Sequence, residues 1–398
     1  MVLNNPNNKI AKSGITRLTL TNFRNYKSLR LNTDLSSIVI SGENGTGKTN
    51  ILEAISFLTP GKGLRGSRLA DIKRISDDED DALTARGWAV AAGVVKDDEE
   101  FEIGTGVEKI TREDDESSSL YDKRIVKVDG EKLASQGELG KYISAVWLTP
   151  QMDRLFRGGS QPRRSFLDRL VYTFDNEHAK RTSSFEHLYK ERYHLLKTGK
   201  NDDYWLGSIE ENMAELGVAI AAARREQIAK LNNFIEKDPD DVFPDVSLEL
   251  DGTVEKMLDN MSALDAEDKY RSILKSQRKN ILYNETTEGV NRTDFKVYYQ
   301  KKSMPAELCS TGEQKSLLIS IILAQTKLMS IDRGFSPIML LDEVVSHLDE
   351  YRREALIEKI KALNVQAWIT STDAALFSSL KKDAQFFIAK DNSIVQGE

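Results

Sequence analysis

Cysteine is nearly absent from this chain of 398 residues, which contains only Cys309. A single cysteine excludes an internal disulfide and a cysteine-rich metal site, and it favours a reducing compartment such as the cytoplasm. Long apolar runs are also missing, because no stretch reaches the roughly 18 residues that a membrane-spanning helix requires. The first thirteen residues are polar and rich in asparagine, without the apolar centre of a signal peptide. We therefore expect a cytoplasmic protein with no membrane-bound part.

A general excess of positive charge is missing too, since 56 basic and 63 acidic residues give a net charge of −7. The charges are spread unevenly, however. Residues 76–116 contain fifteen acidic and four basic residues, whereas residues 157–200 contain ten basic and five acidic ones. A local basic patch can attract a polyanion such as DNA even when the whole chain is acidic. Either run could instead be a solvated face without a ligand.

Hydrophobic periodicity divides the chain into three parts. Alternating or short apolar runs predict strands at residues 15–21, 37–40, 88–95, 100–107, 124–128 and 145–148. From Arg164 to about Arg278 an apolar stripe at helical spacing predicts a compact helical arm, and strand patterns return after Lys302. We expect an α/β head, with a β-rich lobe and a parallel core, formed by residues 1–155 and 301–398. Residues 156–300 would form an inserted arm domain.

The strongest motif follows the second predicted strand and fits the pattern G-x-x-x-x-G-K-[ST]. Its glycines let several backbone N–H groups face phosphate oxygens, and the helix that follows adds the positive end of its dipole. Lys48 would reach the β- and γ-phosphates and assist catalysis, and the Thr49 hydroxyl would bind Mg²⁺. The sequence therefore predicts an ATP site at Gly42, Glu43, Asn44, Gly45, Thr46, Gly47, Lys48, Thr49 and Asn50.

A second motif is the apolar run 338–341, which ends in two carboxylates, Asp342 and Glu343. Ligands of open α/β sheets bind at the carboxyl ends of strands. Asp342 would hold Mg²⁺, directly or through water, and Glu343 would act as general base toward the attacking water. The pattern is weak alone and becomes specific after a phosphate loop.

Residues 310–315, Ser-Thr-Gly-Glu-Gln-Lys, open an amphipathic helix and resemble the signature motif of ABC-type ATPases. In that class the signature caps the γ-phosphate of the nucleotide held by the other subunit. The resemblance implies that Ser310 and Gly312 complete the site in trans and that ATP joins two copies as a homodimer. An ordinary helix cap, with Glu313 at the third helical position, is the alternative.

Two further segments resemble parts of an ABC-type P-loop ATPase head. Gln151 follows an apolar strand and resembles the Q-loop glutamine, which would contact Mg²⁺ and the attacking water. Ser346 to Asp349 resembles the D-loop. The switch histidine of ABC transporters has no counterpart, because none of the four histidines falls in the segment 369–373. A hydroxyl from Ser371 or Thr372 would take its place, and we expect slow hydrolysis.

In combination these motifs resemble the RecF family of bacterial DNA-repair proteins. The similar segments include Phe23-Arg24-Asn25-Tyr26, residues 61–65, residues 147–152 and residues 159–168, besides the motifs above. The resemblance implies a protein that binds ATP and DNA together, forms an ATP-dependent dimer and has a weak, DNA-stimulated ATPase activity. It further implies a role in recombinational gap repair, replication restart and the SOS response, with RecR and RecO and in the loading of RecA. Arg24 is expected near the nucleotide.

The DNA contacts would come from the basic arm, through Arg163, Arg164, Arg181 and Lys190. No base-reading motif is visible, so we expect recognition of the backbone or of the DNA shape. Alternatively, Arg163 and Arg164 brace the arm by pairing with Asp168 or Asp175. At the level of function, the alternative is an ABC-type switch that recruits a protein partner, with the acidic segment 76–116 as its docking face and DNA binding incidental.

Overall fold

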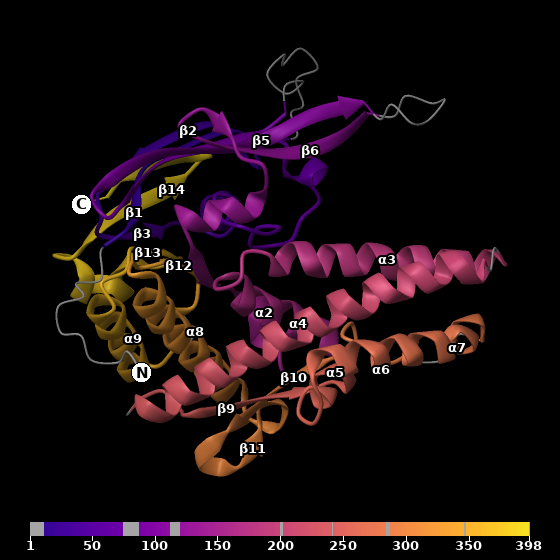
Figure 1. The fold of residues 1–398 in the computed structure, drawn as a ribbon. Coiled ribbons are helices and arrows are strands. Elements are labelled where there is room, and N and C mark those ends of the chain that lie inside the picture. Colours follow the sequence, from indigo (N-terminus) through magenta and orange to yellow (C-terminus); the bar gives the residue numbers. More distant parts are fainter. Residues whose placement is uncertain are drawn as a thin grey trace. The chain divides into compact units, whose positions relative to one another are not determined.

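The computed structural model describes residues 12–74, 87–111, 120–199, 202–240, 242–283, 287–345 and 348–397 (Figure 1). The chain forms two compact units. The head unit comprises residues 1–152 and 325–398, and the helical unit comprises residues 153–324, inserted between them. The second boundary falls later than the sequence suggests, because residues 301–324 pack with the helical unit. Among the helices of the described ranges, none combines the length and the apolarity needed to cross a bilayer.

One sheet of the head unit is antiparallel, with the strand order β2-β1-β4-β5-β6-β7. Its strands are β1 (Gly14–Phe23), β2 (Tyr26–Asn32), β4 (Ala89–Lys96), β5 (Glu99–Thr111), β6 (Leu120–Val128) and β7 (Glu131–Lys132). β1 buries Leu18 and Leu20 on one face, as the alternation of its residues predicts. This sheet is the β-rich lobe expected from the sequence. The acidic residues 76–86 and 112–116 lie outside the described residues.

The second sheet of the head unit has the strand order β15-β14-β3-β13-β12-β8. β15 pairs antiparallel with β14, and all other pairs are parallel. The strands are β3 (Ser37–Ser41), β8 (Ala145–Leu148), β12 (Ile338–Asp342), β13 (Ala367–Ser371), β14 (Ala384–Lys390) and β15 (Ser393–Gln396). β3, β8, β12 and β13 are buried along their whole length, which explains their continuous apolar runs. Their carboxyl ends meet at one edge.

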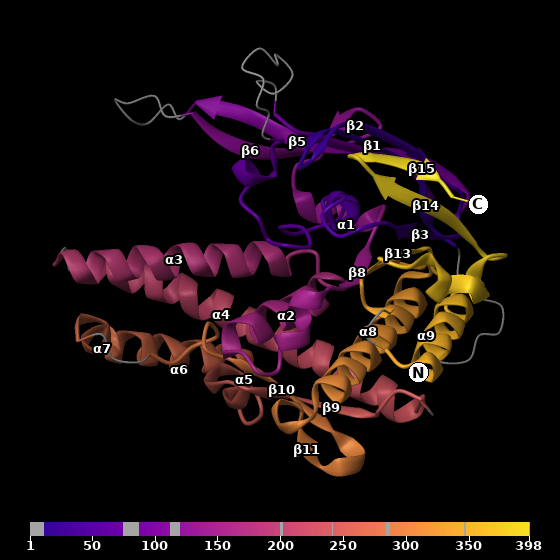
Figure 2. The same ribbon diagram turned by 180° about the vertical axis from the view of Figure 1, so that it is seen from behind.

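Helices cover both faces of this mixed sheet. α1 (Lys48–Ser56) lies between the two sheets, and it contacts β1 on one side and β12 and β13 on the other (Figure 2). α9 (Glu350–Ala362) and the C-terminal part of α8 (Thr311–Arg333) lie on the opposite face. The first turn of α1 therefore starts at the carboxyl edge of the parallel strands, where the functional residues gather.

The described part of the helical unit contains six complete α-helices, the N-terminal part of α8 and a small sheet, and five of the six helices share one apolar core. The helices are α2 (Ser160–Tyr172), α3 (His178–Thr198), α4 (Asp203–Lys237), α5 (Thr253–Met257), α6 (Ala263–Ser276) and α7 (Arg278–Leu282). The antiparallel sheet β11-β10-β9 consists of β9 (Val246–Asp251), β10 (Asp294–Tyr299) and β11 (Met304–Pro305). The apolar stripe predicted on one helix is the buried face of α4, for example Leu206, Met213 and Leu231. This sheet was not predicted from the sequence.

Charged side chains are also buried in the helical unit, and each has opposite charges beside it. Asp168 accepts hydrogen bonds from Nε2 of His178 at 2.9 Å and from Nε and Nη2 of Arg224 at 2.8 and 3.0 Å. Burial alone would raise the pKa of Asp168, but Arg224 and His178 outweigh it and lower the pKa to about 2. Arg192 pairs in the same way with Glu210 at 2.8 Å. These pairs fix how α2, α3 and α4 pack.

Candidate nucleotide site

The phosphate loop connects β3 to α1, and its glycines adopt backbone angles that other residues avoid. Gly42, Gly45 and Gly47 have φ values of 152°, 85° and 99°. A Cβ at Gly42 would overlap the carbonyl oxygen of Ala389, and one at Gly47 would overlap the Asn25 amide and lie 2.8 Å from the Tyr26 hydroxyl. Because a side chain fits at neither position, the loop can present its backbone N–H groups toward an anion.

Lys48, at the first position of α1, is buried against this loop. Its Nζ donates hydrogen bonds to the carbonyl oxygens of Gly42 and Glu43 at 2.5 and 2.9 Å and lies 3.8 Å from Oε1 of Glu343. Burial lowers the pKa of the Lys48 ammonium, while the charges of Glu343 and Asp342 oppose that shift. The Lys48 ammonium is thus held beside the phosphate loop by two carbonyl oxygens and one carboxylate.

Asp342 and Glu343 stand at the end of β12, as the sequence predicts. The Thr49 hydroxyl donates to Oδ1 of Asp342 at 2.8 Å, and the Thr370 hydroxyl donates to the same oxygen at 2.7 Å. Glu343 has a φ of 51°, and its N–H donates to the Thr370 carbonyl and hydroxyl oxygens at 3.2 and 3.1 Å. Thr370 therefore holds both acidic residues at once.

Thr370 is the residue that the sequence analysis missed. It is fully buried in β13, one position before the expected Ser371. The Ser371 hydroxyl accepts from the N–H of Asp373 at 3.2 Å, and Thr372 is exposed. In the sequence, a threonine inside an apolar strand gives no indication of a functional role. Only the parallel pairing of Asp342 with Thr370 brings the two side chains together.

The donor set at this edge suits a magnesium nucleotide. Mg²⁺ prefers oxygen ligands and is usually held by one or two protein side chains together with the phosphates of its substrate. Thr49 and Asp342 provide a hydroxyl and a carboxylate within hydrogen-bond distance of each other. Lys48 and the N-terminus of α1 provide positive charge for the phosphates. The residues present therefore fit ATP and Mg²⁺.

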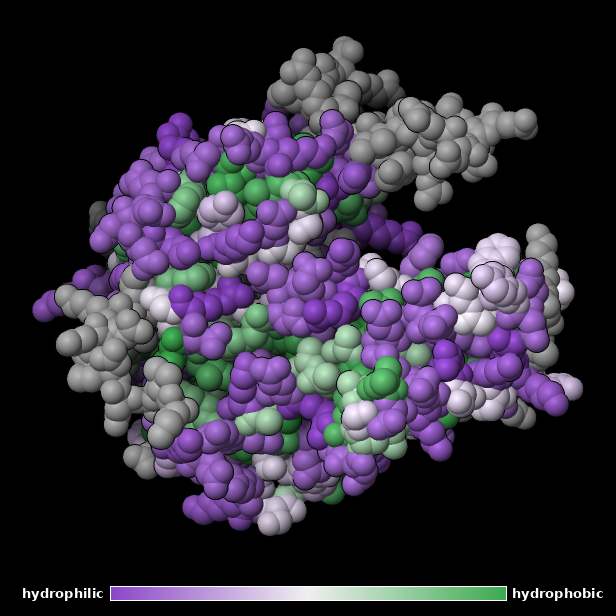
Figure 3. Space-filling model, in the orientation of Figure 1, coloured by the Kyte–Doolittle hydropathy of each residue, from purple (hydrophilic) through white to green (hydrophobic). Residues whose placement is uncertain are grey.

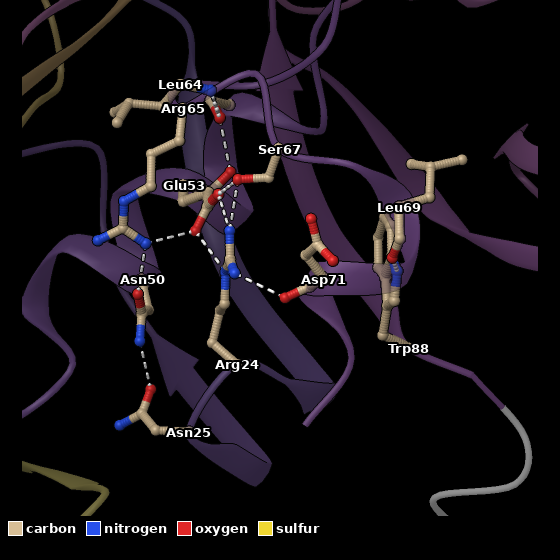
Figure 4. A network of polar contacts seen from close by, with 11 residues as sticks. Arg24, Asn25, Asn50, Glu53, Leu64, Arg65, Ser67, Leu69, Asp71 and Trp88 are labelled. Carbon is tan, nitrogen blue, oxygen red and sulfur yellow. Dashed lines mark hydrogen bonds and ion pairs between the residues drawn. The ribbon is translucent and has the colours of Figure 1, made fainter. Parts of the chain in front are cut away.

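A polar network behind the loop holds Asn25, Asn50 and Arg24 (Figure 4). Oδ1 of Asn25 accepts from Nδ2 of Asn50 at 2.7 Å, and Nδ2 of Asn25 donates to Oδ1 of Asn392 at 2.8 Å. The Arg24 guanidinium donates to both carboxylate oxygens of the buried Glu53 at 2.9 and 2.6 Å. The structure thus gives Arg24 a bracing partner on α1, and its contact with nucleotide stays a prediction.

Gln151 follows shortly after β8, whose carboxyl end lies at the same edge of the sheet. It belongs to a short 3-10 turn, Pro150–Arg154, that follows β8, and β8 is the neighbour of β12. Its side chain is exposed. In the D-loop segment, Ser346 and His347 lie outside the described residues, while Asp349 caps α9 by accepting from the N–H of Arg352 at 2.8 Å.

Ser310 is the N-cap of α8 and belongs to the helical unit. Its hydroxyl accepts from the N–H of Glu313 at 3.3 Å, and the Glu313 carboxylate accepts from the N–H of Ser310 at 2.8 Å. This capping box confirms the alternative for the local structure. Lys302 and Ser310 lower the pKa of Glu313 to about 2. Ser310, Thr311 and Gly312 are nevertheless exposed, and a Cβ at Gly312 would meet open space.

Two of the four arginines and lysines predicted to bind DNA are held inside the helical unit. Arg163 is buried, and its guanidinium donates to both carboxylate oxygens of Asp294 at 2.7 and 2.9 Å and to the Gly158 carbonyl at 2.6 Å. The structure corrects the assignment of Arg163, which braces α2 against β10, although with another partner than the expected Asp168 or Asp175. Arg164 is half-buried and donates to the carbonyl of Thr293 at 2.9 Å.

The other two remain at the surface of α3. Arg181 is half-buried and forms an ion pair with Asp175, which is the partner expected for Arg163 or Arg164. Lys190 is exposed. A third basic residue of the run, Arg192, is 1% exposed beside Glu210 and is structural. The basic patch is therefore smaller than the sequence run suggests.

Comparisons with known proteins agree on one family. A family model described as the RecF/RecN/SMC N terminal domain matches residues 14–395. The curated DNA replication and repair protein RecF of Mesorhizobium japonicum (strain LMG 29417 / CECT 9101 / MAFF 303099) is 42% identical over 96% of this chain and 98% of its own. That of Agrobacterium fabrum (strain C58 / ATCC 33970) is 43% identical over 94% and 96%.

Solved structures show the same fold. The structure of the recombination mediator protein RecF-ATP in the RecFOR pathway superposes with a TM-score of 0.80 at 23% identity, over 99% of this chain and 100% of that chain. An Smc head bound to the C-winged helix domain of ScpA gives a TM-score of 0.53 at 15% identity, over 96% and 97%. The expected ATPase-head fold with a helical insertion is thereby confirmed, and the chain belongs to the RecF family.

Proposed function

We propose that this chain is an ATP-dependent DNA-binding protein of recombinational gap repair whose nucleotide site is completed when two copies meet. The observation that carries the proposal is the cluster at the carboxyl edge of the mixed sheet, where Lys48, Thr49, Asp342 and Glu343 converge. Family membership supports it, because relatives over 40% identical along nearly the whole chain carry the name DNA replication and repair protein.

Within one copy, each residue of the edge has a definite task. Lys48 and the N-terminus of α1 bind the β- and γ-phosphates, and Thr49 and Asp342 hold Mg²⁺, with Gln151 as a further ligand from the turn after β8. Glu343 accepts a proton from the attacking water, which ATP hydrolysis requires. Its backbone is fixed by Thr370, so the carboxylate needs little reorganisation. Binding and positioning carry most of the catalysis in phosphoryl transfer.

The second copy supplies the cap. Ser310 and Gly312 sit at the exposed N-terminus of a long helix, where a hydroxyl, a backbone N–H and the helix dipole together favour an anion. Capping of the γ-phosphate by these residues from the partner copy would make ATP the link between two copies. No histidine lies in the described segment after β13, so the charge that develops there is met by hydroxyl groups and hydrolysis is slow.

DNA binds to the basic face of α3 in this proposal. Arg181 and Lys190 lie on that helix, and Arg164 lies on α2 at a half-buried position. The contacts are to phosphates, so affinity falls with salt and shows little dependence on sequence. The relatives support the pathway role, since two similar structures are described as a recombination mediator in the RecFOR pathway. The role proposed for this chain comprises cooperation with RecO and RecR, loading of RecA, replication restart and the SOS response.

The test is a fluorescence-anisotropy titration of a labelled gapped duplex with the Glu343→Gln protein, with and without Mg-ATP, at one fixed salt concentration. This variant should bind ATP without hydrolysing it. We expect ATP to tighten DNA binding about tenfold, which is roughly 1.4 kcal/mol of coupling. The same protein carrying Lys48→Ala serves as the control and should show no ATP effect, because it loses the phosphate contact.

Equal affinity with and without ATP would mean that the closed dimer does not grip DNA, and a switch that recruits a protein partner would then explain the site better.

The DNA face is tested separately by Arg181→Glu with Lys190→Glu. Its control is Lys381→Glu with Lys382→Glu, which changes the charge equally at two exposed positions of the head unit. Only the first pair should weaken duplex binding, and equal effects of both pairs would contradict the placement on α3.

A further inference from the structure

Exposed aromatic side chains are concentrated at one end of the helical unit. In the part of the chain that the structure describes, five aromatic side chains are exposed: Tyr193, Tyr204, Trp205, Tyr283 and Tyr351, at 44, 89, 49, 75 and 68%. The first four belong to the ends of α3, α4 and α7, and only Tyr351 belongs to the head unit. We call Tyr193, Tyr204, Trp205 and Tyr283 the arm tip.

The arm tip is built by contacts between the ends of three helices. α4 starts where its N-cap, Asp202, accepts hydrogen bonds from the N–H groups of Tyr204 and Trp205 at 2.8 and 3.2 Å. Arg278, at the start of α7, donates to Oδ1 of Asp203 at 2.6 Å and to Oε2 of Glu210 at 2.7 Å, so α7 is tied to the start of α4. Figures 1 and 2 both show the ends of α3 and α7 side by side.

The backbone beneath these rings is anchored. Leu206 and Ile209, directly after the two aromatic residues of α4, and Ile281 of α7 are buried in the core of the helical unit. The rings are therefore presented outward from rigid helices, and side chains of intermediate hydropathy are visible at this end in Figure 3. Tyrosine and tryptophan lose little conformational entropy on binding, so an exposed group of them is a prepared contact surface.

Positive charge surrounds the arm tip. Lys190 and Lys197 of α3 and Lys275 and Lys279 of the α6–α7 segment are exposed, and Nζ of Lys197 lies 5.8 Å from the ring centroid of Tyr193. Residues 271–280 contain four basic residues and no acidic one. Arg271 and Arg278 of this run are paired with carboxylates, whereas Lys275 and Lys279 are exposed, and Asp202 at this end of α4 is the helix cap.

We propose that the arm tip binds single-stranded nucleic acid by stacking its rings on unpaired bases. Proteins that hold single strands combine aromatic rings with cations that follow the phosphates, which is the combination found here. The centre of a protein–protein interface is instead depleted in lysine. The inference rests on the proposed function and adds to it, since a duplex has no free base faces and the arm tip thus selects the single-stranded part of a gap.

The experiment compares two labelled probes, an oligothymidine of about 20 nucleotides and a duplex of the same length, by anisotropy with the full chain. The variant Tyr204→Ala with Tyr283→Ala changes two side chains that are at least three-quarters exposed, so the fold is preserved. Loss of stacking should weaken binding of oligothymidine about tenfold or more and change duplex binding less than about twofold. Tyr204→Phe with Tyr283→Phe keeps the rings and should keep the affinity.

The matched control is Tyr351→Ala, which removes an exposed tyrosine of the head unit and should leave both affinities unchanged. Unchanged oligothymidine binding in the alanine variant, or equal losses with both probes, would overturn stacking at the arm tip. So would a loss of partner-protein binding without any loss of DNA binding. The two proposals remain distinguishable: the change in gapped-duplex affinity that ATP causes in the Glu343→Gln protein tests the proposed function, and that protein keeps all four aromatic side chains of the arm tip.

Discussion

Replacing Thr370 by valine removes one hydroxyl from the centre of the site and keeps the shape of the side chain. That hydroxyl donates to Oδ1 of Asp342 at 2.7 Å and accepts from the N–H of Glu343 at 3.1 Å. After the change Asp342 retains the Thr49 hydroxyl, and the Glu343 N–H retains the Thr370 carbonyl at 3.2 Å. Two hydrogen bonds are therefore lost, and only the one to the buried Asp342 carboxylate involves a charged group.

A hydrogen bond to a charged group contributes about 1.5–3 kcal/mol. Without that hydrogen bond Asp342 and Glu343 are no longer held in place, and we expect the lost free energy to raise the activation barrier of hydrolysis. The rate then falls about 10- to 150-fold, since each 1.4 kcal/mol of activation free energy changes it tenfold. ATP affinity should change less than about threefold, because the phosphate contacts of Lys48 and of the loop do not involve Thr370. The variant should therefore lower kcat and leave nucleotide binding intact.

The assay is DNA-stimulated ATP turnover together with a titration of a fluorescent ATP analogue. Thr370→Ser keeps the hydroxyl and should restore most of kcat. The matched control is Thr293→Val in the helical unit, because Thr293 is equally buried and donates to Oε1 of Glu255 at 2.7 Å. It should cost similar stability without changing kcat. A folded Thr370→Val protein with kcat within twofold of normal, or an equal loss of kcat in Thr293→Val, would refute the role given to Thr370.

Three other changes test separate parts of the structure. Gly47→Ala should abolish ATP binding in calorimetric titration, because its Cβ has no space, whereas Gly45→Ala meets no atom within 4 Å and should cost only the backbone strain of about 1 kcal/mol. Asp168→Asn should destabilise the helical unit by about 3 kcal/mol in hydrogen-exchange measurements, against under 1 kcal/mol for the exposed Asp268→Asn. The pKa of Asp168 is lowered from 3.8 to about 2 in the fold. Its stabilisation, roughly 2–3 kcal/mol, is therefore present above pH 4 and lost as the pH falls toward 2. Ser310→Asp keeps a helix cap but places a carboxylate at the proposed γ-phosphate contact, so ATP-driven dimerisation in light scattering should vanish while binding of ATP to the monomer persists.

The central part of the head could be predicted because its signals are local. β3, β8, β12 and β13 are short apolar runs buried on both faces, and the phosphate loop is a continuous motif between a strand and a helix. The convergence of Lys48 and Glu343 followed from the rule that parallel strands bring their carboxyl ends to one edge. Their roles in binding and catalysis stay predictions.

The parts that were missed depend on partners distant in the sequence. β9 pairs with β10 across more than forty residues. Val246, Leu248 and Leu250 alternate with polar residues, a local strand signal that was missed inside a region assigned to helices. Arg163 finds Asp294 131 residues away, so its sequence neighbours suggested other partners. Thr370 acquires its task only through its register with Asp342. Pairing between distant segments, which composition and periodicity do not contain, decides the roles of Arg163 and Thr370.

Contacts with distant residues also decide how many cations of the basic run, residues 157–199, can bind DNA. Of the basic residues between 157 and 199, Arg163 and Arg192 are buried in ion pairs, and Arg181 is paired with Asp175. The cations at the surface are Arg157, Lys180, Lys190 and Lys197, and Arg181 is half-buried. Because each neutralised phosphate adds about −0.9 to the slope of log K against log salt, each arm should add about −4, not the −8 expected if all nine cations touched DNA. A measured slope near the larger value would mean that DNA lies on another face, since the buried Arg163 and Arg192 release no counterions.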